Sequence, residues 1–279
     1  MIKYSSRMIG FILILLTIGV FSPGRSFADT LKLGGTGTDL GTMRLLADAF
    51  KKQSPGTTIE IQPSVGSTGG VRAVMAGVFD IGISSRPLKD EERKQGAQEW
   101  AYAKTPFIFA TNKKSSQTQL TSAEIIGIYA GTMTKWKDGT TVRLVLRPET
   151  ETDTLLLIQY IPGMEAAMKK AYQRRGLPIA STDQDAADNI QKIAGAVGPS
   201  TLALILGENR PLKALAINNV APTVENIANG TYPMIKSLYL ITGSHPKAEV
   251  QRFIDFIRSN EGAAILRRTG HLVLTPEVK

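Results

Sequence analysis

Residues 31–38 read Leu-Lys-Leu-Gly-Gly-Thr-Gly-Thr, an apolar run that leads directly into a loop of glycine and threonine. Residues 59–70 (Ile-Glu-Ile-Gln-Pro-Ser-Val-Gly-Ser-Thr-Gly-Gly) and 79–86 (Phe-Asp-Ile-Gly-Ile-Ser-Ser-Arg) repeat the pattern, and a helix-like segment follows each loop. Glycine lets the backbone approach a ligand closely, and the first turn of a helix offers free N–H groups at the positive end of its dipole. Three such loops meeting at one place would bind an anion without a metal or cofactor.

Strand-like and helix-like segments alternate along the rest of the chain. Apolar residues recur at helical spacing in residues 40–52, and Thr121 with Glu124 forms a capping box that begins a later helix. Further predicted elements are helices at 90–98, 154–160, 164–174 and 181–193, and strands at 142–146 and 212–217. This alternation predicts an α/β fold with mostly parallel sheets flanked by helices.

The first 28 residues have the pattern of a secretory signal peptide. Lys3 and Arg7 precede the apolar run 9–20, and Ser26-Phe27-Ala28 offers a small-x-small cleavage site. We expect cleavage after Ala28 and an exported protein, periplasmic or secreted. An uncleaved membrane anchor is the less favoured alternative because the apolar run is short for a membrane span.

The charge balance is mildly basic. Removing residues 1–28, which hold three basic residues and no acid, lowers the formal net charge from +9 to +6. The basic residues are scattered rather than clustered, so the charge helps to attract an anion without indicating nucleic acid. We expect no nucleic-acid partner.

The titratable residues give no indication of a metal site, cofactor or catalytic centre. The chain has no cysteine, and its two histidines, His245 and His271, lie outside the glycine-rich loops and are predicted to be surface or cap residues. Asp183, Asp185 and Asp188 fall at the start of one predicted helix, where acids suit the helix dipole, and their spacing does not match a calcium loop. We therefore predict no metal, no cofactor and no enzyme activity.

Two arginines are candidates for binding an oxyanion. Arg86 and Arg147 each lie at or after the end of a predicted strand, which is where α/β folds place ligands. A guanidinium offers a planar fork of donors that fits an oxyanion. The alternative, a surface salt bridge, stays open for each of them.

Several motifs together resemble the phosphate-binding proteins of ABC-type importers. The resemblance covers almost the whole chain after the signal peptide and is carried by residues 35–50, 66–73, 71–82, 80–88, 131–136 and 220–232. It implies the two-lobed type II fold of periplasmic binding proteins, with a ligand held between the lobes. The implied lobes are residues 29–106 with 233–279, and residues 107–232. It also implies a monomer that serves the membrane subunits of an ABC transporter.

The resemblance also implies where a small phosphate-like anion would bind. The three glycine-rich loops would supply donors from one lobe, and Arg147 with the loop after it would supply donors from the other. The candidate ligand-binding residues are Thr36, Gly37, Thr38, Ser67, Thr68, Ser85, Arg86, Arg147, Thr150 and Thr152.

Two departures from the family pattern bear on the ligand. Ser85 stands where these proteins commonly have an aspartate, which accepts the proton of hydrogen phosphate. The second-lobe motif, usually Arg-x-x-Gly-Ser-Gly-Thr, has lost its glycines and gained acids at positions 149, 151 and 153. These acids would oppose an anion if they face the cleft, or would favour the start of the following helix if they do not.

The sequence thus predicts an exported solute-binding protein of an ABC transporter that binds phosphate or a related small oxyanion. One alternative is a periplasmic sensor or scaffold of the same fold that has lost tight phosphate binding or binds another small solute. A phosphoester hydrolase is disfavoured because the sequence offers no nucleophile with a matching base or metal set.

Overall fold

The computed structural model describes residues 1–2 and 29–274. The predicted signal peptide therefore lies, apart from Met1 and Ile2, outside the described residues, and so does its cleavage site. No helix in the described part has the length and apolar character needed to cross a bilayer.

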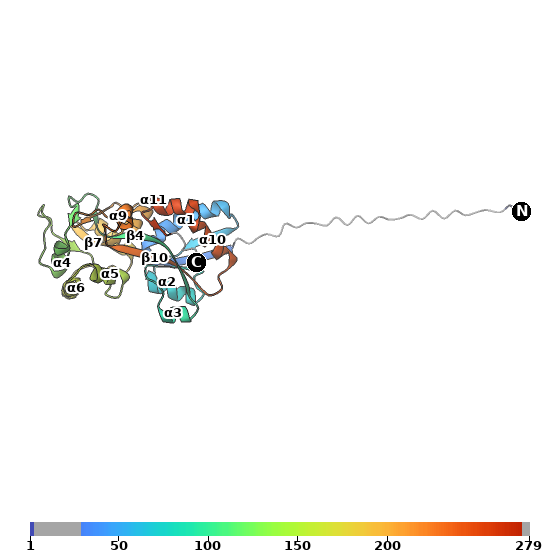
Figure 1. The fold of residues 1–279 in the computed structure, drawn as a ribbon, viewed down its shortest axis with the longest axis horizontal. Helices are drawn as coiled ribbons and strands as arrows, with labels where there is room; N and C mark the ends of the chain where they lie inside the picture. Colours follow the sequence, from blue (N-terminus) through green and yellow to red (C-terminus); the bar gives the residue numbers. More distant parts are fainter. Residues whose placement is uncertain (3–28, 275–279) are drawn as a thin grey trace.

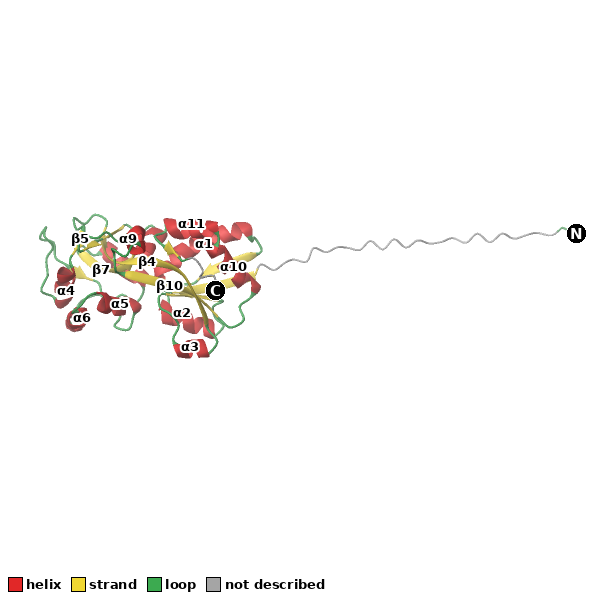
Figure 2. Ribbon diagram, viewed as in Figure 1, coloured by secondary structure: helices red, strands yellow, loops and turns green. Residues whose placement is uncertain are grey.

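A mixed sheet runs through the length of the molecule (Figures 1 and 2). At one end of it β1 (Asp29–Gly35) lies between β2 (Thr57–Ile61) and β3 (Ile81–Ser84), and all three are parallel. Next come β10 (Ile235–Thr242) and the long β4 (Gln98–Asn112), which are antiparallel to their neighbours. The carboxyl ends of the three parallel strands therefore place the three glycine-rich loops at one edge of the sheet.

The second part of β4 continues into the other end of the molecule. There β4 pairs antiparallel with β7 (Ala196–Thr201) and β8 (Leu212–Ala214), while β6 (Arg143–Leu144) lies parallel to β7. Two short pairings complete the strands: β5 (Gln119–Leu120) with β9 (Ala216–Ile217), and β11 (Leu272–Val273) with β4. The sheets are mixed rather than mostly parallel, because β4 and β10 run side by side in opposite directions along the centre of the molecule.

Helices cover both faces of the sheet at each end (Figure 1). At the β1 end they are α1 (Leu40–Gln53), α10 (Ala248–Arg258) and α11 (Asn260–Arg268) on one face, and α2 (Gly66–Met75) and α3 (Asp90–Lys94) on the other. At the β7 end they are α4 (Ser122–Ala130), α5 (Thr152–Tyr160), α6 (Met164–Gln173), α7 (Asp183–Lys192), α8 (Leu202–Gly207) and α9 (Val224–Ala228). A short 3₁₀ turn, η1 (Gly37–Asp39), precedes α1.

Two large apolar clusters form the core, one at each end of the sheet. Leu33, Phe50 and Phe253 belong to the cluster at the β1 end, and Tyr129 and Trp136 to the cluster at the β7 end. Burial of such side chains is the main stabilising term in a chain without cysteine. We call the parts around these clusters the first half and the second half.

Local signals in the sequence set several element boundaries. Thr121 and Glu124 form the predicted capping box at the start of α4, and α5 and α6 are separated at Pro162-Gly163 as predicted. The helix predicted at 90–98 ends at Lys94, because Gly96 has φ +91° and the chain then turns into β4. The strand predicted at 142–146 is shortened to β6, and the strand predicted at 212–217 is divided into β8 and β9, which pair with different strands, β4 and β5.

Candidate functional site

The first glycine-rich loop places a backbone segment and two hydroxyls at the edge of the sheet where the three parallel strands end. Gly35 has φ +148°, and the N–H of Thr36 donates to the carbonyl of Ile83 on β3 at 2.9 Å. Thr36 then caps η1, with its hydroxyl accepting from the N–H of Thr38 at 3.5 Å. Thr36, Gly37 and Thr38 are all buried, so this loop is a fixed part of the structure.

The second and third loops meet through two serines. Ser67 lies in the first turn of α2, and its hydroxyl oxygen is 3.0 Å from the hydroxyl oxygen of Ser85. The N–H of Ser85 also donates to the Ser67 hydroxyl at 2.9 Å. Both side chains are buried, whereas Thr68 beside them is exposed. The three predicted loops are therefore brought together, as contacts of the first loop with Ile83 and of the second with the third show.

Arg86 is paired within the first half. Its guanidinium donates two hydrogen bonds to the carboxylate of Glu92, at 2.8 and 2.7 Å, and one to the hydroxyl of Thr68 at 3.3 Å. The hydrogen bond from Arg86 is the main reason that the pKa of Glu92 lies below its ordinary value. Arg86 thus forms a salt bridge, the alternative that the sequence left open. Its contact with the second glycine-rich loop and α2 is the hydrogen bond to Thr68.

Arg147 lies in the second half and is buried among acids. Its Nε donates to Oδ2 of Asp153 at 3.3 Å, and its Nη2 lies 3.9 Å from carboxylate oxygens of both Asp183 and Glu151. A further N–H donates to the carbonyl of Ala180 at 2.6 Å. The donor that the resemblance assigns to a solute anion therefore already has carboxylate partners within the chain.

Lys236 on β10 completes this cluster and was missed by the sequence analysis. The side chain is only 2% exposed, and its ammonium donates to the Thr38 hydroxyl at 2.9 Å and pairs with Asp153. Its Nζ also lies 3.7 Å from Oδ1 of Asp183. Because Lys236 and Thr38 belong to the first half and Asp153 and Asp183 to the second, these contacts join the two halves. We call Arg147, Asp153, Asp183 and Lys236 the cleft ion cluster.

Asp183 has a role that its position at a helix start did not reveal. Burial alone would favour the neutral acid, but Lys236, Arg147 and hydrogen bonds from Thr38 and the Gly37 backbone outweigh it, so the pKa of Asp183 lies below its ordinary value. Burial likewise acts to lower the pKa of Lys236, and Asp153 and Asp183 raise it above its ordinary value. Both groups of the pair are therefore held in their charged forms.

The pKa of Asp183 predicts a pH dependence of stability. Since the folded-state pKa is depressed, the stabilisation by the carboxylate is present above the ordinary aspartate pKa and is lost as the pH falls through the folded-state value. We expect the difference in unfolding free energy between the protein and its Asp183→Asn variant to be constant from about pH 5 to 8 and to shrink below about pH 4. Denaturant titrations across this range measure it, with Asp48→Asn, an exposed acid on α1, as the control. A difference that grows on acidification would contradict the assignment.

Glu151 links the cleft ion cluster to the first turn of α2. A Cβ placed on Gly66, the first residue of α2, would lie 3.3 Å from Oε1 of Glu151. Burial raises the pKa of Glu151, with Arg147 opposing and Asp153 and Asp183 adding to the shift. Two of the three acids gained in this loop, Asp153 and Glu151, therefore lie against Arg147, while Glu149 is exposed.

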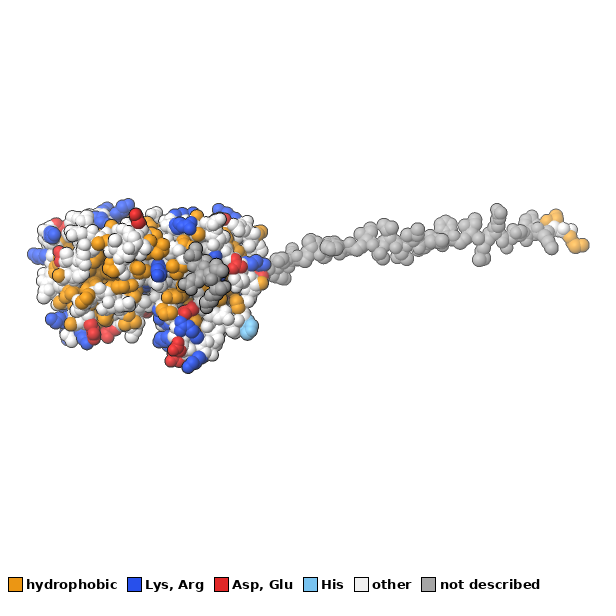
Figure 3. Space-filling model, in the orientation of Figure 1, with side chains coloured by type: hydrophobic (Ala, Val, Ile, Leu, Met, Phe, Trp, Pro, Cys, Tyr) orange, Lys and Arg blue, Asp and Glu red, His pale blue; other side chains and the backbone are white. Residues whose placement is uncertain are grey.

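The remaining predicted site residues are Thr150 and Thr152, on either side of Glu151. Thr150 is exposed in the loop before α5, and Thr152 is half-buried as the first residue of that helix. Figure 3 shows the surface hollowed on this side of the molecule, between the end that carries α4, α5 and α6 and the end that carries α2 and α3. Solvent can therefore approach the second glycine-rich loop, which leads into α2, whereas Arg147 and Lys236 are buried.

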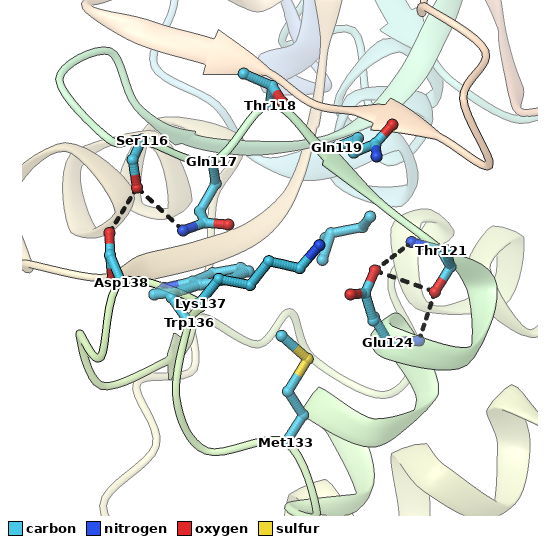
Figure 4. Close-up of a pocket in the computed structure, with 11 residues that line it drawn as sticks. Ser116, Gln117, Thr118, Gln119, Thr121, Glu124, Met133, Trp136, Lys137 and Asp138 are labelled. Atoms are coloured by element: carbon cyan, nitrogen blue, oxygen red, sulfur yellow. Dashed lines mark hydrogen bonds between the residues drawn. The ribbon is translucent and has the colours of Figure 1, made fainter.

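A separate cavity of about 450 Å³ lies in the second half, away from these residues. Figure 4 shows the side chain of Lys137 extending across it, with Trp136 and Met133 on its walls and Glu124 engaged with Thr121. None of the predicted anion-binding residues lines it. Among the described residues, no group of histidines and acids has the arrangement to hold a metal ion.

The two histidines differ in position. His245 is exposed and His271 is fully buried near the end of α11, so the prediction of surface or cap residues holds for His245 as a surface residue and for His271 as a cap. Its Nδ1 lies 3.0 Å from the carbonyl of Leu266 near the end of α11, and its Nε2 lies 2.9 Å from Asp39. Asp39 also accepts from the hydroxyl of Tyr102 at 2.5 Å, so this group of side chains ties α11, η1 and β4 together within the core.

The chain belongs to the PBP superfamily. A family profile described as "PBP superfamily domain" matches residues 22–261. The protein SphX of Synechococcus elongatus is 27% identical over 258 residues, which cover 82% of this chain and 73% of SphX. The phosphate-binding protein PstS of Borreliella burgdorferi is 26% identical over 223 residues, which cover 74% of this chain and 77% of PstS.

Solved structures share the fold. A candidate phosphate ABC transporter substrate-binding protein from Clostridium perfringens, with bound phosphate, superposes with a TM-score of 0.75 at 24% identity, covering 88% of this chain and all of that one. An ABC-type phosphate transport receptor from Vibrio cholerae superposes with a TM-score of 0.60 at 22% identity, covering 87% of this chain and 99% of that one. The predicted resemblance and the type II periplasmic binding fold are confirmed. The relatives carry names of binding proteins rather than of enzymes, in agreement with the predicted lack of enzyme activity.

Proposed function

We propose that this protein is an exported solute-binding protein of an ABC transporter, and that it binds phosphate or a related small oxyanion in the cleft between its halves. The carrying observation is the pair of serine hydroxyls where the second and third loops meet: Ser67 at the start of α2 and Ser85 after β3, whose oxygens lie 3.0 Å apart. Helix N-termini with adjacent hydroxyl donors favour oxyanions. The names of the relatives, phosphate-binding proteins and ABC transporter components, support the same class of ligand and partner.

The proposal includes a division into two lobes, residues 29–106 with 233–279 and residues 107–232. Ile235 pairs with Pro106, and the N–H of Phe107 donates to the carbonyl of Met234 at 2.9 Å, so both crossings lie side by side. Apart from Met234, the buried residues of the two main apolar clusters fall on opposite sides of this division. In this arrangement the protein acts as a monomer in the periplasm or outside the cell, and the membrane subunits of the transporter receive it.

A test by ligand-induced stabilisation follows from the Ser67–Ser85 pair. We expect one oxyanion among phosphate, arsenate, sulfate, molybdate, tungstate and phosphonates to raise the unfolding midpoint selectively, because a ligand that binds only the folded state stabilises it. Ser67→Ala removes a hydroxyl donor and should weaken that binding by about 1.5–3 kcal/mol. Calorimetric titration of the protein, first unfolded and refolded to remove carried-over ligand, measures the change. Ser181→Ala, at an exposed serine of the second half, should bind as the parent does.

A second function is favoured by one specific observation. Arg147 and Lys236 are already paired with Asp153 and Asp183, as expected of a sensor or scaffold that has kept the fold without tight phosphate binding. The absence of any midpoint shift with the whole oxyanion panel would favour this alternative. An equal shift with Ser67→Ala would place the ligand elsewhere in the protein.

A further inference from the structure

The carboxylate of Asp183 has the surroundings of a bound anion. Its Oδ1 accepts from the Thr38 hydroxyl at 3.4 Å and lies 3.7 Å from the ammonium of Lys236, and its Oδ2 lies 3.9 Å from the guanidinium of Arg147. A Cβ added to Gly37 would lie 2.8 Å from Oδ2, so only glycine allows the first loop to approach this closely. The side chain is 7% exposed.

These partners are the donors expected to hold a solute anion at this end of the cleft. Gly37 and Thr38 are the predicted donors from the first loop, and Arg147 is the predicted donor from the second half. A solute oxyanion at the same place would have to displace a carboxylate that already satisfies them, and two anions in contact repel strongly in a buried site.

The position of Asp183 is fixed by its own helix. The Thr182 hydroxyl accepts from the N–H of Asp185 at 3.0 Å, and the Asp185 carboxylate accepts from the N–H of Thr182 at 3.0 Å, which closes a capping box at the start of α7. The next side chain, Gln184, donates to the carbonyl of Gly37 at 2.9 Å and to Glu208 at 2.7 Å. The start of α7 is therefore held against the first loop by contacts on both sides of Asp183.

We propose that Asp183 is a built-in anion that determines the specificity of the cleft: it occupies the Gly37–Thr38–Arg147 end and restricts a solute oxyanion to the α2 end, at Ser67 and Ser85. This inference rests on the proposed function in naming the α2 end as the place of the solute. Asp153 does not take the same role, because it contacts Arg147 and Lys236 but none of the first-loop donors. The chain thus carries one fixed carboxylate where the resemblance implies a diffusible ligand.

The test is to remove the carboxylate and supply an anion from solution. In Asp183→Ala, phosphate or formate should raise the unfolding midpoint far more than in the parent protein, and phosphate should bind at least tenfold more tightly by calorimetric titration. Matched chloride at equal ionic strength controls for screening, and Asp48→Ala, at an exposed acid on α1, should behave as the parent does. Asp183→Ser, which also removes the carboxylate and leaves space for an added anion, gives the same direction of change if the alanine variant does not fold.

The outcomes separate the two proposals. Phosphate binding to the variant but not to the parent would support the built-in anion and overturn the proposed function. Equal phosphate binding by both would overturn the built-in anion and leave the proposed function standing. Failure of both proteins to respond to phosphate or formate would overturn the built-in anion as well.

Discussion

Replacing Lys236 with methionine is expected to lower the free energy of unfolding by about 3–5 kcal/mol, the typical result of removing one partner from a buried ion pair. The ammonium is the cation that joins Thr38 to both Asp153 and Asp183, and all four side chains are buried. Methionine keeps most of the volume, so the loss reports charge rather than packing. After the change, Arg147 alone faces two buried carboxylates.

Denaturant titration at neutral pH measures this loss. Lys32→Met, at an exposed lysine on β1, is the matched control and should change the free energy of unfolding by no more than about 0.5 kcal/mol. A Lys236→Met variant as stable as the control would show that the cleft ion cluster does not contribute to holding the halves together.

The second large effect is expected at Gly35. Its φ of +148° is unfavourable for a side chain, and an added Cβ would lie 2.0 Å from the carbonyl oxygen of Ile83, which is backbone and cannot rotate away. We expect Gly35→Ala to lower the free energy of unfolding by at least about 3 kcal/mol, which combines backbone strain with displacement of β3. The first loop would then lose its pairing with Ile83 on β3.

Gly56 offers a control of the same chemistry. A Cβ there would meet nothing within 4 Å, so Gly56→Ala should change the free energy of unfolding by no more than about 0.5 kcal/mol. Thermal and denaturant unfolding of the two variants side by side measure the difference. Equal stability of both variants would contradict the close approach of the first loop to β3.

The sequence predicted those features of the fold that depend on neighbouring residues. Thr121 with Glu124 is the predicted local pair at the start of α4, and α7 begins two residues after its predicted start, where Thr182 pairs with Asp185. The sequence also predicted that the glycine-rich loops meet, because loops after neighbouring parallel strands share one edge of a sheet. These signals act over a few residues or over one repeated pattern, so one chain is enough to detect them.

The composition of the site depended on contacts between distant residues. Lys236 lies 83 positions from Asp153, its buried partner, and 198 positions from Thr38, and nothing in the run around it marks a charged partner. Asp183 fits a helix start equally well whether its carboxylate faces solvent or the cleft. The acids at 149, 151 and 153 did indicate a change in the anion site, but only the structure shows that Asp153 and Glu151 lie against Arg147.

The central claim is that the two halves are joined by the cleft ion cluster and not by a solute. Small-angle X-ray scattering of the protein, unfolded and refolded to remove carried-over ligand, tests this most directly. We predict the same radius of gyration with and without saturating phosphate, because Lys236 already connects β10 to Asp153 and Asp183. A ligand-free protein that is more extended and contracts when phosphate is added would contradict the claim.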